Sequence, residues 1–369
     1  MRLYVHWPFC VSRCTYCDFN TRAGAGRHMR EYMAALLTEL DFWSTLLDEE
    51  RRRLDSVYLG GGTPSILSGA EVSRLLDQVR SRFVLGEGAE VTVEVNPATW
   101  KANDLLAACA GGANRFSIGV QSLHDPVLRL LGRAHDAASA LECIEEAHAA
   151  GAASVSADLI YGLPGEDTAM QLDSVRGVIA AGARHVSLYG LSLSRGSRLP
   201  GILRESGKKL PGDDEMADQY LASCAALEAA GFAQYEISNF ALPGHHSRHN
   251  LGYWARDEYL GVGAGAHSFL GDCRFHNTRS ILSYISAMRG GRPASGGWER
   301  LGAIERREEE IILGLRTASG VPADALDAGD DRLEDLVDLG LLLVSGGRAR
   351  LTRRGMLVSN AVITELLPA

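Results

Sequence analysis

Short apolar stretches alternate with helical segments along the first half of the chain. Residues 29–48 carry apolar side chains at helical spacing, with Tyr32, Leu36 and Leu40 on one stripe. Six apolar stretches have the length of strands: residues 3–6, 56–59, 91–96, 116–121, 155–160 and 186–191. Repeated strand–helix units predict a parallel sheet with right-handed crossovers. Six such units fit an open barrel related to the TIM architecture, so the expected fold class is α/β, a partial (β/α)6 barrel.

Several of these expected strands carry polar residues on one face. In residues 91–96, Thr92, Glu94 and Asn96 alternate with valines. Side chains alternate faces along a strand, whereas a parallel strand covered by helices on both sides is apolar throughout. The same alternation gives polar faces with Tyr4 and His6, Ser117 and Gln121, and Ser156 and Asp158. Four strands are therefore expected to line a common cavity that holds a polar ligand.

The second half of the chain changes character, and we predict three parts. Residues 1–195 form the barrel, residues 196–299 extend it, and residues 300–369 form a smaller domain. In the last part, helices at 304–317 and 331–339 precede a hairpin at 341–351 and a final helix at about 353–367. This order resembles a winged-helix module, an α+β arrangement. Its arginines could suggest nucleic acid, but in an acidic chain they are more typical of a solvated wing: Arg348, Arg350, Arg353 and Arg354.

Composition and charge exclude some classes of function. The chain has 369 residues, 46% of them hydrophobic, and a formal net charge of −9. This charge argues against broad binding to nucleic acid or to anionic membranes. No stretch approaches the roughly 18 apolar residues of a membrane span, and the start lacks the pattern of a signal peptide. We therefore expect a cytoplasmic protein.

Three cysteines follow the first expected strand. Cys10, Cys14 and Cys17 have the spacing CxxxCxxC. Thiols so close together in a chain without an export signal indicate a metal or cluster site rather than disulfides. A [4Fe–4S] cluster takes four cysteines when it only carries electrons, so three ligands leave one iron free to bind something else. The alternative is a zinc knuckle with a distant fourth ligand, although zinc sites more often pair cysteines as CxxC twice.

Other candidate ligand-binding residues lie at the ends of the expected strands. Gly60, Gly61 and Gly62 follow the second strand, where the absence of a side chain lets the backbone pass close to a ligand. The alternative is a plain turn. Asp158 places a carboxylate on the inward face of the fifth strand. Arg133, taken alone, is typical of a solvated charge at a helix end.

These segments together resemble the oxygen-independent coproporphyrinogen III oxidase group of the radical S-adenosylmethionine (SAM) proteins. The matching stretches are YVHWPFC, GGGTPS, VEVNP, SIGVQS, DLIYGLPGE and HNLGYW. The resemblance implies that Cys10, Cys14 and Cys17 bind a [4Fe–4S] cluster whose free iron chelates SAM, and that the reduced cluster cleaves SAM. It implies that these residues surround SAM: Tyr4, Tyr16, Gly61, Gly62, Thr63, Glu94, Gln121, Arg133 and Asp158.

Two departures from the oxidase resemble the heme-chaperone branch of the same group. The oxidase has a further cysteine just after the third, where this chain reads Cys17-Asp18-Phe19. The oxidase also carries a segment before its first strand, whereas the first expected strand here begins at Leu3. These departures place substrate decarboxylation in doubt.

The stretch HNLGYW matches the HNxxYW motif that is linked to heme in that branch. The match implies that His249, Asn250, Tyr253 and Trp254 contact heme. A neutral imidazole can ligate heme iron, and the two aromatic rings offer flat apolar faces to a porphyrin. His249 is the expected ligand, ahead of His267. The alternative is a polar surface loop that holds three histidines: His245, His246 and His249.

The expected function is therefore a heme chaperone built on a radical SAM barrel. It would bind heme and deliver it to recipient proteins, among them membrane-associated respiratory proteins. The alternative is a true coproporphyrinogen III oxidase of heme biosynthesis. A third possibility, a radical SAM enzyme that acts on RNA, is motivated by the C-terminal outline and disfavoured by the acidic charge, so no nucleic-acid partner is expected.

Overall fold

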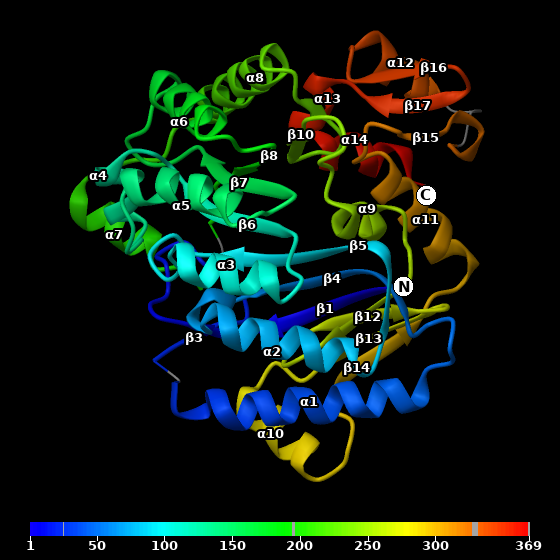
Figure 1. The fold of residues 1–369 in the computed structure, drawn as a ribbon. Helices are drawn as coiled ribbons and strands as arrows, with labels where there is room; N and C mark the ends of the chain where they lie inside the picture. Colours follow the sequence, from blue (N-terminus) through cyan, green and yellow to red (C-terminus); the bar gives the residue numbers. More distant parts are fainter. Residues whose placement is uncertain (25, 194–195, 327–330, 368–369) are drawn as a thin grey trace.

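A sheet of twelve strands organises the barrel part of the molecule (Figure 1). This computed structural model describes residues 1–24, 26–193, 196–326 and 331–367. The centre of the sheet is formed by parallel strands in the order β1 (Arg2–Trp7), β4 (Arg53–Gly61), β5 (Val84–Val95), β6 (Arg115–Gln121), β7 (Ser154–Tyr161) and β8 (His185–Gly190). The six strands expected from the sequence are all confirmed.

Helices connect successive strands and cover the apolar face of the sheet. They are α1 (Met29–Leu46), α2 (Gly69–Arg80), α3 (Ala102–Ala110), α4 (Asp125–Leu130), α5 (Ala137–Ala149) and α6 (Thr168–Ala180). Side-chain oxygens of Ser68, Asp136 and Asp167 accept hydrogen bonds from the first turns of α2, α5 and α6, which fixes where these helices begin. Helix α1 confirms the expected apolar stripe, with Tyr32 and Leu36 buried.

The sheet continues beyond the parallel strands on both sides. Next to β1 come β11 (Tyr259–Val262), which is parallel, and then β12 (His267–Leu270), β13 (Cys273–Asn277) and β14 (Ser295–Arg300), which are antiparallel. Next to β8 come β10 (Asn239–Ala241) and β9 (Ala233–Gln234). Because the sheet begins at β14 and ends at β9, the barrel is open. Helices α7 (Leu199–Ser206), α8 (Asp213–Ala229), α9 (Arg248–Trp254) and α10 (Ile281–Arg289) complete this part.

The last part of the chain has a hydrophobic core of its own, formed by Ile311, Leu315, Leu342 and Val362 among others. Its elements are α11 (Ala303–Gly314), β15 (Val321–Pro322), α12 (Asp331–Asp338), β16 (Leu342–Ser345), β17 (Arg348–Leu351), α13 (Arg353–Leu357) and α14 (Ser359–Leu366). The two helices and the hairpin agree with the winged-helix outline. The prediction of a single final helix was wrong, because the backbone leaves helical geometry at Val358 and divides it into α13 and α14.

No helix in the described ranges is long and apolar enough to cross a membrane.

Candidate cofactor and heme sites

The polar faces of the parallel strands turn toward one cavity of about 470 Å³. Each central strand except β1 contributes side chains to it, among them Tyr58, Glu94, Ser117, Asp158 and Ser187. The opposite faces are buried against the helices, as Val93 and Ile118 illustrate. This arrangement confirms the expectation of a polar interior rather than the packed apolar core of a closed barrel. We call this space the inner cavity.

All three cysteines of the CxxxCxxC segment line the inner cavity as free, partly exposed thiols. Burial raises the pKa of the Cys10 thiol. Within the described residues no group of three or more His, Cys, Asp or Glu side chains could hold a metal ion as it stands. The zinc-knuckle alternative therefore stays a prediction, which metal analysis decides. Three sulfur donors facing a polar cavity fit a cluster that keeps one iron for another ligand.

Arg133 lies beside these thiols. Its Nη1 is 3.5 Å from Cys14 Sγ, and its Nη2 donates to the carbonyl of Gly119 at 2.6 Å. The Nε atom is buried and has no partner within the described residues. The alternative of a solvated charge at a helix end is therefore wrong. An unpartnered buried donor on the cavity wall is what a polar ligand would satisfy.

Two carboxylates of the cavity are held by donors of the chain itself. Glu94 accepts from the Tyr58 hydroxyl at 2.9 Å and from the Gly61 amide at 3.0 Å, and burial raises its pKa to about 7. Asp158 accepts from the hydroxyls of Ser117 at 2.9 Å and Ser156 at 3.2 Å. Burial raises its pKa as well. Both positions are set before any ligand arrives.

Two further candidates occupy the cavity wall. Gln121 lies at the end of β6 with a φ of +69°, a region that side-chain-bearing residues seldom adopt. Such strained positions concentrate at binding sites. Tyr16 lines the cavity next to the cysteines, and burial raises the pKa of its hydroxyl.

The glycine run has a packing reason that the sequence did not reveal. Gly61 has a φ of +111°, and a Cβ added there would lie 2.4 Å from the ring of His6. A Cβ on Gly62 would lie 2.6 Å from the carbonyl oxygen of Phe9. Gly61, Gly62 and Thr63 do line the inner cavity, so they can approach a ligand. The glycines are required first by the close contact between β4 and the end of β1, and a plain turn does not describe them.

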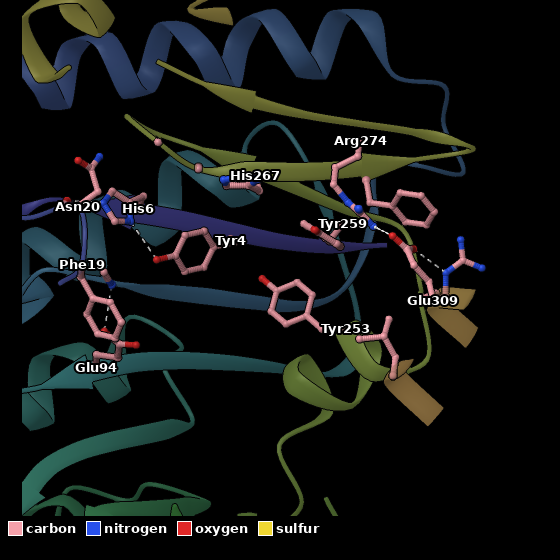
Figure 2. A pocket seen from close by; sticks show the side chains of 16 residues that line it. Tyr4, His6, Phe19, Asn20, Glu94, Tyr253, Tyr259, His267, Arg274 and Glu309 are labelled. Atoms are coloured by element: carbon pink, nitrogen blue, oxygen red, sulfur yellow. Dashed lines mark hydrogen bonds and ion pairs between the residues drawn. The ribbon is translucent and has the colours of Figure 1, made fainter. Parts of the chain in front are cut away.

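A second pocket of about 550 Å³ lies next to the inner cavity, and we call it the outer pocket (Figure 2). Gly61 and Glu94 line both spaces. Tyr4 belongs to the outer pocket, where its hydroxyl is 3.0 Å from Nδ1 of His6. The polar face of β1, Tyr4 and His6, therefore lines the outer pocket and not the inner cavity as expected. Tyr4 lies at the border of the two spaces, with its ring centroid 6.1 Å from that of Tyr58, and its place beside SAM stays a prediction.

The HNLGYW segment forms helix α9 between the two spaces rather than a polar loop. His249 is 1% exposed, with Nδ1 2.8 Å from the Ser56 hydroxyl and Nε2 2.9 Å from the Tyr253 hydroxyl. Burial lowers its pKa to about 3, so the ring is neutral. Because both nitrogens are occupied, His249 is not open to iron in this conformation. The surface alternative is therefore wrong for this residue, and the predicted direct ligation requires the ring to leave Ser56 or Tyr253.

The rest of the motif is divided between the two spaces. Asn250 lines the inner cavity and Tyr253 the outer pocket. Trp254 lines neither of them. His245 and His246, the other histidines of the expected loop, are half-buried.

Sequence reasoning missed part of the inner cavity. Arg115 is 3% exposed, and its Nη1 donates to Ser154 Oγ at 3.0 Å and to the carbonyl of His245 at 2.9 Å. His185 is buried, with ring nitrogens 2.7 Å from both Ser156 Oγ and Tyr235 Oη. The alternation rule could have found them, because Arg115 precedes Ser117 by two positions on β6 and His185 begins the polar face of β8.

Comparison with known families agrees with this geometry. The sequence matches the model of the radical SAM superfamily over residues 4–175 and that of the HemN C-terminal domain over residues 301–358. The structure of the Escherichia coli coproporphyrinogen III oxidase HemN, described as a radical SAM enzyme, superimposes with a TM-score of 0.83 at 25% identity. The match covers 99% of this chain and 89% of that chain. The fold and the three-cysteine cavity are those of a radical SAM protein.

Relatives narrow this class. The heme chaperone HemW of Mycobacterium tuberculosis (strain ATCC 25618 / H37Rv) is 40% identical over 369 residues, which covers 99% of this chain and 94% of the relative. HemW of Bacillus subtilis (strain 168) is 33% identical, and the match covers 99% of this chain and 98% of the relative. The mitochondrial radical S-adenosyl methionine domain-containing protein 1 of Bos taurus is 36% identical, and the match covers 99% of this chain and 87% of the relative. The chain therefore belongs to the HemW family.

Proposed function

We propose that this protein is a heme chaperone on a radical SAM scaffold, which binds heme and passes it to recipient proteins. One observation carries the proposal. The 40% identity with a named heme chaperone extends over nearly the whole of both chains, so it includes the barrel, helix α9 and the C-terminal domain. Heme is the cargo in this proposal, and the cluster and SAM are the resident cofactors.

The inner cavity is the proposed site of those cofactors. Cys10, Cys14 and Cys17 hold the [4Fe–4S] cluster, which when bound supplies a free iron that chelates the amino and carboxylate groups of SAM. Arg133 keeps a positive charge next to the thiolates and offers its unpartnered Nε to a ligand. The remaining residues of the proposed SAM site are Tyr16, Gly61, Gly62, Thr63, Glu94, Gln121 and Asp158, with Tyr4 at the border with the outer pocket.

The cluster assignment is tested by metal analysis after anaerobic reconstitution. Cys14→Ser should lower the iron and sulfide content to a small fraction of the wild-type values, because a hydroxyl replaces one of three thiolate ligands. Cys273→Ser is the matched control and should leave both contents unchanged, because Cys273 lies in β13 away from the cavity. Stoichiometric zinc in place of iron and sulfide would contradict the assignment.

The chaperone function is tested with hemin. Titration of the reconstituted protein should produce a saturable Soret band, and the loaded protein should give its heme to an apo-cytochrome in membrane vesicles. We propose membrane-associated respiratory proteins as recipients and the cytoplasm as the location. The seven free cysteines support a reducing compartment. A protein that binds no heme, or that keeps it in the presence of the apo-recipient, would refute the chaperone function.

The second candidate is coproporphyrinogen III oxidase activity. The close superposition on HemN favours it, with a TM-score of 0.83. Against it, Asp18 and Phe19 follow Cys17 where the oxidase pattern has a further cysteine. An anaerobic assay with coproporphyrinogen III, SAM and a reductant separates the two functions. Formation of protoporphyrinogen would reverse their order.

We do not propose a nucleic-acid partner. Arg348 donates to the carbonyls of Ser319 and Gly320 at 2.7 Å each, and Arg353 pairs with Glu228 of helix α8. These arginines are engaged within the chain, which supports the interpretation of the hairpin as a structural wing. Filter binding to bulk RNA at physiological salt is the test, and retention of the RNA would contradict this part.

We also propose the three-part division at residues 195 and 299, for which limited proteolysis is the test.

A further inference from the structure

The outer pocket has the chemistry of a site for an aromatic molecule that carries carboxylates. Its walls come from β1, α9, β11, β12 and β13, and its end is closed by α11 of the C-terminal domain (Figure 2). Five aromatic side chains contribute to the lining: Tyr4, Phe19, Tyr253, Tyr259 and Phe269. Flat rings around a space of about 550 Å³ suit a large planar ligand.

Two arginines at the end of this pocket share one carboxylate. Arg256 Nε is 3.1 Å from Glu309 Oε2, and Arg274 Nη2 is 2.5 Å from Glu309 Oε1. Both guanidinium groups lie over the ring of Phe269, at 5.4 and 5.9 Å from its centroid. The Arg256 and Glu309 side chains are only 12% and 18% exposed. Planar donors in this setting are suited to binding carboxylates.

Glu309 comes from a different part of the chain than the arginines it joins. It lies on α11, whereas Arg256 follows α9 and Arg274 lies on β13. The two other acidic partners of these arginines are at the rim. Glu310 pairs with Arg256 and is 67% exposed, and Glu299 pairs with Arg274 and is 59% exposed. Glu309 is therefore the carboxylate that closes the pocket, whereas Glu310 and Glu299 pair with the arginines from the solvent-exposed rim.

An open imidazole faces the same pocket. His267 lines it from β12, and its ring nitrogens have no hydrogen-bond partner among the described residues, its ring contact being a stack on His276 at 4.9 Å. His6, the other imidazole of the lining, has Nδ1 and Nε2 occupied by Tyr4 and Asn20. His267 is two positions from Phe269, which pairs with Arg274 across the strands. The imidazole and this arginine thus share a face, ~7 Å apart along it.

We propose, on the basis of the heme-chaperone function above, that heme docks in the outer pocket with its propionates displacing Glu309 from Arg256 and Arg274, and with His267 as the ligand of its iron. Glu309 is then an internal competitor that occupies the carboxylate site when no heme is present. Loading separates α11 from the two arginines, and return of Glu309 favours release. The contact between the C-terminal domain and the barrel therefore regulates the affinity for cargo.

The test is a set of hemin titrations with the full-length reconstituted protein. Glu309→Gln removes the competing charge and should tighten hemin binding roughly tenfold, the change that ~1.4 kcal/mol produces. Glu310→Gln and Glu299→Gln are matched controls on the same arginines and should change the affinity for hemin less than twofold. Hemin dimethyl ester lacks the carboxylates, so it should bind the wild type more weakly and gain nothing from Glu309→Gln. Arg256→Gln should weaken hemin binding and leave the ester unaffected.

The iron ligand is read by spectroscopy. His267→Ala should shift the Soret and visible bands of the heme complex, whereas Glu309→Gln should keep the wild-type band positions. An unchanged spectrum overturns the iron assignment. The carboxylate exchange is overturned if the wild type and Glu309→Gln bind hemin with equal affinity, or if the wild type binds hemin and its ester equally. In that case heme transfer by the wild type would still support the chaperone function. Absence of heme binding by the wild type would end both proposals.

Discussion

Replacement of Glu39 by leucine should destabilise the protein by ~3 kcal/mol. Glu39 lies on α1 and is 2% exposed. It accepts from the Gly263 amide at 2.8 Å, the Tyr284 hydroxyl at 2.6 Å and the Asn277 side-chain amide at 2.7 Å. These contacts hold the loop between β11 and β12 against the barrel. That loop continues into the wall of the outer pocket.

The magnitude follows from the donors that would be left without an acceptor. The Asn277 amide keeps a second acceptor, the Gly263 carbonyl at 2.9 Å. The Gly263 N–H and the Tyr284 O–H both lose the carboxylate that accepts from them, and each unmet buried donor costs ~1–3 kcal/mol. Leucine recovers part of this cost, because burial raises the pKa of Glu39, which means that its ionised form is disfavoured there.

Urea unfolding with linear extrapolation measures the effect. Glu39→Leu should lower the midpoint at an unchanged slope, and Glu31→Leu, an exposed position on the same helix, should stay within about 0.5 kcal/mol of the wild type. Addition of Tyr284→Phe to Glu39→Leu removes one stranded hydroxyl. The double variant should therefore lose ~1–2 kcal/mol less than the sum of the single variants. Equal midpoints for Glu39→Leu and Glu31→Leu, or strict additivity, would refute the reasoning.

Two further predictions concern pH and backbone strain. Burial raises the pKa of Glu166 to about 7 from an ordinary 4.5. Between these pH values the folded state keeps a proton that the unfolded state releases, so this group costs the wild type stability as the pH rises, up to ~3 kcal/mol. Thermal unfolding should show that the stability of Glu166→Gln relative to the wild type increases by up to ~3 kcal/mol between pH 4.5 and 7.5. A stability difference that does not change with pH would contradict this prediction. Gly61→Ala should cost ~2–4 kcal/mol because of the positive φ and the clash with His6. Gly86→Ala, whose added Cβ would meet its nearest atom at 3.5 Å, should be nearly neutral, and similar urea midpoints for the two variants would contradict the strain argument.

Local patterns were sufficient to predict the barrel and its polar interior. The period-two alternation in residues such as Val93 and Glu94 depends only on strand geometry, so it identified the cavity face before any contact was known. The cysteine spacing likewise predicted a loop whose thiols share one space. The resemblance of the motifs to a known family supplied the identity of the cofactors, which spacing alone left open.

The roles of residues on the helices and of their long-range partners were decided only by the tertiary structure. Nothing near His249 in the sequence indicates that Ser56, on a strand 193 positions away, occupies one of its ring nitrogens. The meeting of Arg256 and Arg274 with Glu309 likewise depends on how α11 packs against the barrel. Periodicity determines which face of an element is polar. Only packing between distant elements determines whether a polar group on that face is free to bind or is already held by a partner.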